Sequence, residues 1–173
     1  MRNITIRPAI AADIPAVRDM LREYTDWIGL DLAFQEIDAE LAGLPGEYAP
    51  PSGALFVAAD GNYLAGMIAL RPLDERACPA SAGSAQAGEM KRLFVRPAAR
   101  GQGLAKRLIA QVIDEAKRLG YVEVRLDTLP MMGDAQALYA AMGFADIEAY
   151  YDTPIAGTRF MALRLRSGQA KRL

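Results

Sequence analysis

The chain has 173 residues, of which 52% are hydrophobic and 24% are charged, and its formal net charge is −1. This composition is typical of a soluble globular protein with a sizeable core, and no apolar run reaches the roughly 18 to 20 residues of a membrane span. One cysteine and no histidine exclude an internal disulfide, histidine-based triads and the usual zinc sites, so acid–base chemistry would depend on Glu, Asp, Tyr or water.

The first half of the sequence predicts two helices and three strands. In chain order, these elements are expected at about residues 4–7, 13–27, 32–42, 54–60 and 63–71. Asp13 is a suitable N-cap for the first helix, whose apolar residues repeat every three or four positions. Gly61 and Asn62 separate the last two strands and favour a tight turn, so these strands are expected to form a hairpin.

The second half predicts alternating strands and helices. These are expected at about residues 89–95, 103–119, 121–128, 134–142, 144–151 and 158–165. The small residues of 76–88 predict a loop, and a crossover through the helix at 103–119 would make its flanking strands parallel. We therefore expect an α+β fold with a mixed, mostly antiparallel sheet of about seven strands, about four flanking helices and one central parallel pair. One domain over 1–173 is expected, with 166–173 as a frayed tail.

Charge is distributed unevenly along the chain. Residues 13–47 contain nine acidic and two basic side chains, whereas residues 91–118 contain eight basic and two acidic ones. The first region would suit cations and the second anions, although two solvated surfaces explain the charges equally well. Tyr24 and Trp27 add aromatic faces to the acidic region, which weakly favours a cationic partner.

The segment VRPAARGQGLAKRL, residues 95–108, places two glycines between a predicted strand and a predicted helix. It lacks the Gly-Lys-Ser/Thr ending of a P-loop, and Lys106 stands where a dinucleotide fingerprint has its third glycine. What remains is a helix N-terminus whose unpaired N–H groups and positive dipole end suit a pyrophosphate or a similar dianion. A glycine turn that only begins a helix is the alternative. Four mobile cations are expected around the turn, and they are Arg96, Arg100, Lys106 and Arg107.

Two motifs occur in order, EMKRLFVRPAARGQGLAKRLIAQVIDEAKRLGY from residue 89 and AQALYAAMGF at 135–144. They resemble the acetyl-CoA-binding motif and the second signature of the GCN5-related N-acetyltransferase (GNAT) superfamily. The family pattern Gln/Arg-x-x-Gly-x-Gly/Ala corresponds to Arg100, Gly103 and Ala105. The resemblance covers about residues 89–165, and the N-terminal half matches only in its order of elements.

The resemblance implies transfer of an acetyl group from acetyl-CoA to a primary amine of a small molecule, an amino acid or a protein, by direct attack in a ternary complex. It implies no metal. The backbone of 93–95 would pair with the pantetheine arm, and the amides of 100–106 would bind the pyrophosphate. The implied cofactor-binding residues are Leu93, Phe94, Val95, Arg100, Gly101, Gln102, Gly103, Leu104, Ala105 and Lys106. Tyr139 would donate a proton or a hydrogen bond to the departing CoA thiolate. Its alternative role is that of an aromatic residue packed in the core.

Glu89 is the leading candidate for the general base, because the amine must lose a proton before it attacks. An ion pair of Glu89 with Lys91 or Arg92 on the surface is weighed equally, and a water chain to Asp127 or Asp134 is a third reading. By strand alternation, one face would carry Glu89, Lys91, Leu93 and Val95.

One position departs from the family pattern. Met132 stands where the family often has asparagine. This change puts in doubt an amide contact to the cofactor or a proton path for the substrate, and Asp134 could take over part of that role. The acceptor is expected to enter between the first two helices, the loop at 76–88 and the last hairpin.

The expected partner is a small-molecule or protein amine. Nucleic acid is not expected, because the basic residues flank a glycine turn and have few interleaved aromatics. We expect no membrane partner and a cytoplasmic location, since the N-terminal residues do not resemble a signal peptide. A homodimer is left open. The alternative function is a non-catalytic acyl-CoA-binding or sensing module on the same fold.

Overall fold

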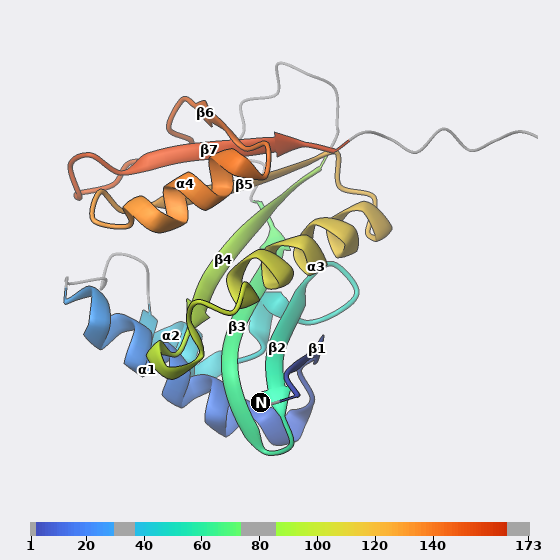
Figure 1. The fold of residues 1–173 in the computed structure, drawn as a ribbon. Helices are drawn as coiled ribbons and strands as arrows, with labels where there is room; N and C mark the ends of the chain where they lie inside the picture. The colour runs from blue at the N-terminus through green and yellow to red at the C-terminus, as the bar shows by residue number, and fades with distance from the viewer. Residues whose placement is uncertain (1–2, 30–36, 74–85, 166–173) are drawn as a thin grey trace, which may run out of the picture. The chain divides into compact units, whose positions relative to one another are not determined.

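The computed structural model describes residues 3–29, 37–73 and 86–165 (Figure 1). Its contacts divide the chain into two compact units, Met1–Arg71 with Met90–Val112 and Pro72–Glu89 with Ile113–Leu173. Strand β4 (Ala87–Val95) and helix α3 (Leu104–Arg118) each contribute residues to both units. The expectations for 32–36, 76–85 and 166–173 lie outside the described residues.

The first unit combines a hairpin with two helices. Its other elements are β1 (Thr5–Pro8), α1 (Ile14–Ile28), α2 (Ile37–Gly43), β2 (Ala54–Asp60) and β3 (Tyr63–Pro72). Strand β2 pairs antiparallel with both β1 and β3, and the predicted two-residue turn at Gly61 and Asn62 is confirmed. The apolar face of α1 is buried through Val17, Met20 and Leu21, whose three- and four-residue spacing places them on one side of the helix.

The role of Asp13 at the start of α1 differs from the helix cap that the sequence predicts. A short 3-10 turn (Ala11–Asp13) precedes the helix, and Asp13 at the N-cap position makes no side-chain cap bond. Its carboxylate instead accepts the Ile10 N–H at 2.8 Å and two bonds from the Arg7 guanidinium at 2.6 and 3.0 Å. The bond from Arg7 holds the pKa of Asp13 below its ordinary value. Asp13 therefore ties β1 to the start of α1 instead of capping the helix.

The second unit contains the parallel strand pairing. Its elements include β5 (Glu123–Thr128), α4 (Gly133–Ala141), β6 (Ala145–Ile147) and β7 (Arg159–Arg164). Residues 87–89 of β4 pair in parallel with residues 123–125 of β5, and β7 pairs antiparallel with both β5 and β6.

The strand expected at 144–151 is shorter than predicted. Only Ala145–Ile147 is a strand, because Tyr150 and Tyr151 leave the ladder and pack their rings against Phe160, each with centroids 5.1 Å apart.

In hydrogen-bonding order the sheet is β1-β2-β3-β4-β5-β7-β6, with seven strands. The β4–β5 pair is parallel, whereas the pairs of β2 with β1 and β3, and of β7 with β5 and β6, are antiparallel. The described α-helices are α1 to α4. The predicted fold class is therefore confirmed, including its parallel pair. In the described parts of the chain, no helix is long and apolar enough to cross a membrane.

Candidate functional site

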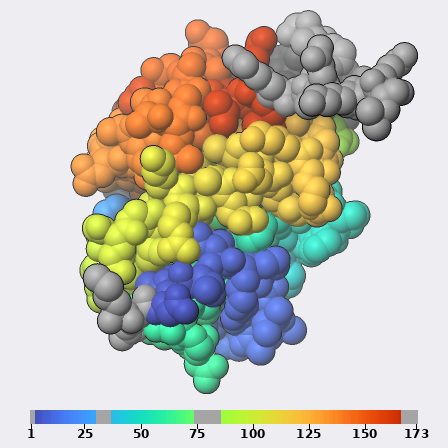
Figure 2. Space-filling model, turned by 45° about the vertical axis from the view of Figure 1, so that its right-hand side comes forward, coloured from blue at the N-terminus to red at the C-terminus, as the bar shows by residue number. Residues whose placement is uncertain are grey.

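The turn between β4 and α3 has the geometry of an anion-binding nest. Gly101 and Gly103 have φ values of 76° and 70°, which glycine adopts without the steric cost of a side chain. The N–H of Arg107 donates to the Gly103 carbonyl at 3.1 Å, but in the described part of the chain the N–H groups of 101–106 have no acceptor. Residues 100–103 are exposed, and this yellow-green part of the chain lies at the surface in Figure 2. The unpaired donors at the start of α3 can therefore bind an anion.

Two of the arginines near this turn are bonded within the protein. Arg96 forms an ion pair with Glu23 at 2.6 and 2.9 Å and donates to a backbone carbonyl at 2.8 Å. The hydrogen bond that Arg96 donates to Glu23 raises the pKa of Arg96. Arg107 donates to the Ile4 carbonyl at 3.1 Å. The expectation of four mobile cations is therefore wrong, because these side chains are held in place, whereas the exposed Lys106 has no partner among the described residues.

Arg100 is held between the turn and α1. Its Nε donates to the Val95 carbonyl at 3.0 Å, and its guanidinium lies 5.2 Å from the centre of the Trp27 ring. Glu23 and Trp27 are four residues apart on α1, as Arg96 and Arg100 are in the chain, so one face of α1 holds the turn at two points. The matching spacing was visible in the sequence, but nothing in it indicated which segments meet.

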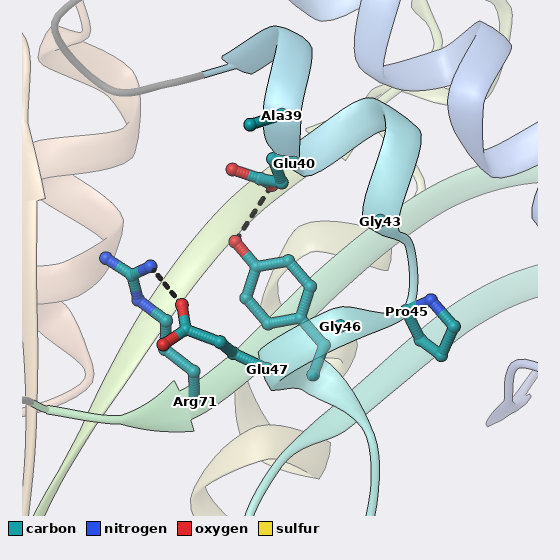
Figure 3. A pocket seen from close by; sticks show the side chains of 8 residues that line it. Ala39, Glu40, Gly43, Pro45, Gly46, Glu47 and Arg71 are labelled. Carbon is teal, nitrogen blue, oxygen red and sulfur yellow. Dashed lines mark hydrogen bonds and ion pairs between the residues drawn. The ribbon is translucent and has the colours of Figure 1, made fainter.

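A buried ion pair fixes the middle of β4. Arg92 has a φ of 59°, which interrupts the alternation expected along this strand. Its buried guanidinium bonds to both carboxylate oxygens of Glu40 at 2.7 to 3.2 Å. The Tyr48 hydroxyl donates to Glu40 at 2.9 Å, a bond marked by a dashed line in Figure 3. Burial acts to raise the pKa of Glu40, but the bonds and charge of Arg92, with the Tyr48 bond, hold it below its ordinary value. We refer to Arg92, Glu40 and Tyr48 as the Arg92 cluster.

The Arg92 cluster borders a pocket of about 200 Å³. Figure 3 shows Glu40 among the residues that line this pocket, together with the ion pair of Glu47 with Arg71 at 2.7 Å. None of the residues that line this pocket belongs to the predicted site.

Glu89 is buried, with 2% of its surface exposed, and lies opposite Arg125 in the parallel β4–β5 register. Its carboxylate accepts a hydrogen bond from the Tyr150 hydroxyl at 3.0 Å. The surface position weighed for Glu89 in its alternative role is therefore wrong, and the guanidinium of Arg92 bonds to Glu40. A carboxylate inside the protein with a neutral donor beside it can act as a proton acceptor.

Tyr139 lies in α4 and is 7% exposed. Its ring packs against Phe144 with centroids 5.9 Å apart, which is compatible with both the packing role and the proton-donor role considered for it. Met132, at the family's asparagine position, is the N-cap residue of α4, and its carbonyl accepts the N–H of Gln136 at 3.0 Å. Asp134 lies in the first turn of this helix.

The predicted site residues belong to both units. Residues 93–95 and 100–106 lie in the first unit, where the structure brings together the end of β4, the turn and the start of α3. Glu89 and Tyr139 lie in the second. The residues that sequence reasoning missed are Glu23, Glu40 and Tyr150. Trp27, which was considered for a cationic partner, lies beside Arg100 of the same chain.

A mixed sheet followed by a glycine turn and a helix start with free amides is an arrangement that suits a diphosphate-containing cofactor. The sequence matches the model of the acetyltransferase (GNAT) family over residues 14–144. An uncharacterized N-acetyltransferase of Schizosaccharomyces pombe is 36% identical over 165 residues, which cover 94% of this chain and 96% of that protein. The chain therefore belongs to the GNAT family, and the resemblance seen in its two motifs is confirmed.

Solved structures show the same fold. An acetyltransferase of the GNAT family from Staphylococcus aureus superimposes with a TM-score of 0.74 at 20% identity, covering 94% of this chain and 99% of that one. NAA60 of Arabidopsis thaliana, solved in complex with acetyl-CoA, has a TM-score of 0.69 at 17% identity, with coverage of 94% and 99%.

Proposed function

We propose that the protein is an N-acetyltransferase that moves the acetyl group of acetyl-CoA to a primary amine by direct attack in a ternary complex. The observation that carries this proposal is the run of unpaired N–H groups at 101–106, at the start of α3. A pyrophosphate accepts several hydrogen bonds, and the positive end of the helix dipole favours its charge. Family membership and the acetyl-CoA complex of NAA60 support the same cofactor.

Each residue then has a defined role. The backbone of 93–95 would pair with the pantetheine arm as an added strand. Glu89 would accept the proton that the amine loses as its nitrogen attacks the thioester carbonyl carbon. As the carbon–sulfur bond breaks, Tyr139 would supply a proton to the departing thiolate, so the products are an amide and free CoA.

The chemistry of the acceptor does not follow from the acidic region. Of the seven acidic side chains of this region that the structure describes, five form ion pairs with arginines. They are Asp13, Asp19, Glu23, Glu40 and Glu47. These pairs neutralise much of the charge that favoured a cationic acceptor. We therefore propose only an amine of a small molecule, an amino acid or a protein.

The proposed activity is tested by thiol release from acetyl-CoA with a panel of amines that includes polyamines, amino acids and peptides with free N-termini. We expect acceptor-dependent release of CoA, and an acetylated product by mass spectrometry. Binding of acetyl-CoA without thiol release from any acceptor would instead favour the non-catalytic acyl-CoA-binding module.

A further inference from the structure

We propose that Tyr150 is a positioning residue for Glu89, and that its hydroxyl orients the Glu89 carboxylate for proton transfer from the acceptor amine. The inference rests on the proposed function, in which Glu89 is the general base. It adds a residue that lies outside both motifs.

The contact joins two buried groups. The Tyr150 hydroxyl donates to Oε1 of Glu89 at 3.0 Å, and the two residues are 9% and 2% exposed. An ionised carboxylate in the protein interior is unfavourable unless donors stabilise its charge. The phenol supplies such a donor in a part of the second unit where water has little access.

The type of donor matters for a base. Glu40 bonds to the guanidinium of Arg92, and this cation helps to hold the pKa of Glu40 below its ordinary value. A carboxylate paired in this way is difficult to protonate, so it is a poor proton acceptor. The Tyr150 phenol is neutral, so its hydrogen bond orients Glu89 without adding a positive charge beside the carboxylate.

The Tyr150 ring is fixed by its surroundings. Its centroid lies 5.6 Å from that of Tyr151 and 5.1 Å from that of Phe160, both in edge-to-face geometry. On β5, the guanidinium of Arg125 lies 5.8 Å from the ring centre. These contacts fix the ring, so the hydroxyl is held toward Glu89, as preorganised catalysis requires.

Tyr150 acts as a donor and does not itself exchange the proton. Burial raises the pKa of Tyr150, and the negative charges of Glu89 and Asp127, the bond to Glu89 and the neighbouring Tyr151 raise it further. Arg125 is the cation that faces the ring from β5. The phenol therefore stays protonated at the pH at which an amine is acetylated and remains a donor to Glu89.

The first test compares Tyr150→Phe with Tyr151→Phe, using the most active amine of the panel. Tyr150→Phe should lower kcat about 10-fold at neutral pH and move the acidic limb of the pH profile about one unit higher, since a bond to a charged group is lost. Acetyl-CoA affinity should not change. Tyr151→Phe removes a neighbouring hydroxyl from the same aromatic cluster and should leave both the rate and the acidic limb unchanged. Wild-type kinetics in Tyr150→Phe, or an equal loss in both variants, would overturn the proposal.

A double-mutant cycle shows whether Tyr150 acts through Glu89. Adding Tyr150→Phe to Glu89→Gln should lower kcat by less than about twofold, because the group that Tyr150 positions is already gone. A further loss of about 10-fold in the double variant would mean that Tyr150 acts independently, which overturns the inference.

The single variant Glu89→Gln distinguishes the base role of Glu89 from the positioning role of Tyr150. Full turnover in Glu89→Gln would remove the base assignment of the proposed function, and the inference with it. Loss of turnover in Glu89→Gln with unchanged kinetics in Tyr150→Phe would remove the inference alone.

Discussion

The glycine turn is exposed at residues 100–103, and the backbone N–H groups of 101–106 have no acceptor among the described residues, whereas Glu89 and Tyr150 are buried and bond to one another. A dianion is already charged and can accept hydrogen bonds from several backbone N–H groups. Its site therefore needs only N–H groups that have no partner within the protein. Proton transfer needs one side chain in one orientation, and that side chain must be held before the substrate arrives. The comparison predicts that changes in the turn affect cofactor affinity and that changes in buried polar groups affect stability or rate.

The largest effect is expected from Gly103→Trp. The indole would occupy the nest and the backbone would be forced from its left-handed conformation, so acetyl-CoA affinity should fall about 10³-fold as several charge-assisted bonds are lost. Isothermal titration calorimetry measures this directly. Gly61→Trp is the matched control, because Gly61 also has a positive φ and no atom within 4 Å of an added Cβ. Equal affinities in the two variants would show that the turn does not bind the cofactor.

Glu40→Gln should lower the free energy of unfolding by about 3 kcal/mol at pH 7, because the buried Arg92 guanidinium loses its counter-charge. Urea unfolding measures the change. Asp19→Asn breaks the exposed ion pair with Arg22 and should cost less than about 0.5 kcal/mol. Similar losses in the two variants would contradict the view that burial makes the Arg92 cluster important.

The same pair predicts a pH dependence. The pKa of Glu40 is lowered in the folded state, so the stability from this ion pair is fully present above its ordinary value of 4.5. That stability is lost as pH falls from 4.5 through the lowered pKa. The difference in unfolding free energy between wild type and Glu40→Gln should therefore shrink below pH 4.5, and a constant difference down to acid pH would argue against it.

Tyr139→Phe should lower kcat about 10²-fold with little change in acetyl-CoA affinity, because only the proton for the departing thiolate is lost. Steady-state kinetics and calorimetry separate the two quantities. Tyr121→Phe removes another buried phenol of the second unit that lies outside the signature, and its kcat should stay at the wild-type value. Full activity in Tyr139→Phe would leave this tyrosine only its packing role.

The smallest effect is expected from Trp27→Leu. The change removes the aromatic face beside Arg100 but keeps the bond from Arg100 to the Val95 carbonyl, so acetyl-CoA affinity should fall about threefold. Calorimetry under the same conditions as for Gly103→Trp measures it, and Trp27→Phe should have an intermediate affinity. An unchanged affinity in Trp27→Leu would mean that the bond to Val95 suffices to hold Arg100.

Features with a local cause could be predicted from the sequence. Gly61 and Asn62 specify a tight hairpin turn through their own backbone preferences, and the turn forms as expected. The start of α3 was likewise predictable, because glycines followed by an amphipathic pattern define a helix N-terminus. The parallel pair followed from the crossover rule, which depends only on the order of elements.

Features that depend on distant partners could not be predicted. The Glu23–Arg96, Glu40–Arg92 and Tyr150–Glu89 contacts join residues 73, 52 and 61 positions apart, and no periodicity links their members. These contacts explain the specific errors. Arg96 was expected to be mobile and Glu89 was considered for the surface because their partners were unknown. Tyr150 was placed in a strand because the apolar pattern does not show that its ring packs against Phe160.

The left-handed backbone at Arg92 has a consequence for engineering this protein. A common way to stabilise a protein is to replace such residues with glycine, and Arg92 is the one non-glycine residue with a positive φ in the described part of the chain. Arg92→Gly would relieve the backbone but leave the buried Glu40 carboxylate without its cation. Thermostabilisation at this position would therefore require a paired design, in which Glu40 becomes neutral in the same step.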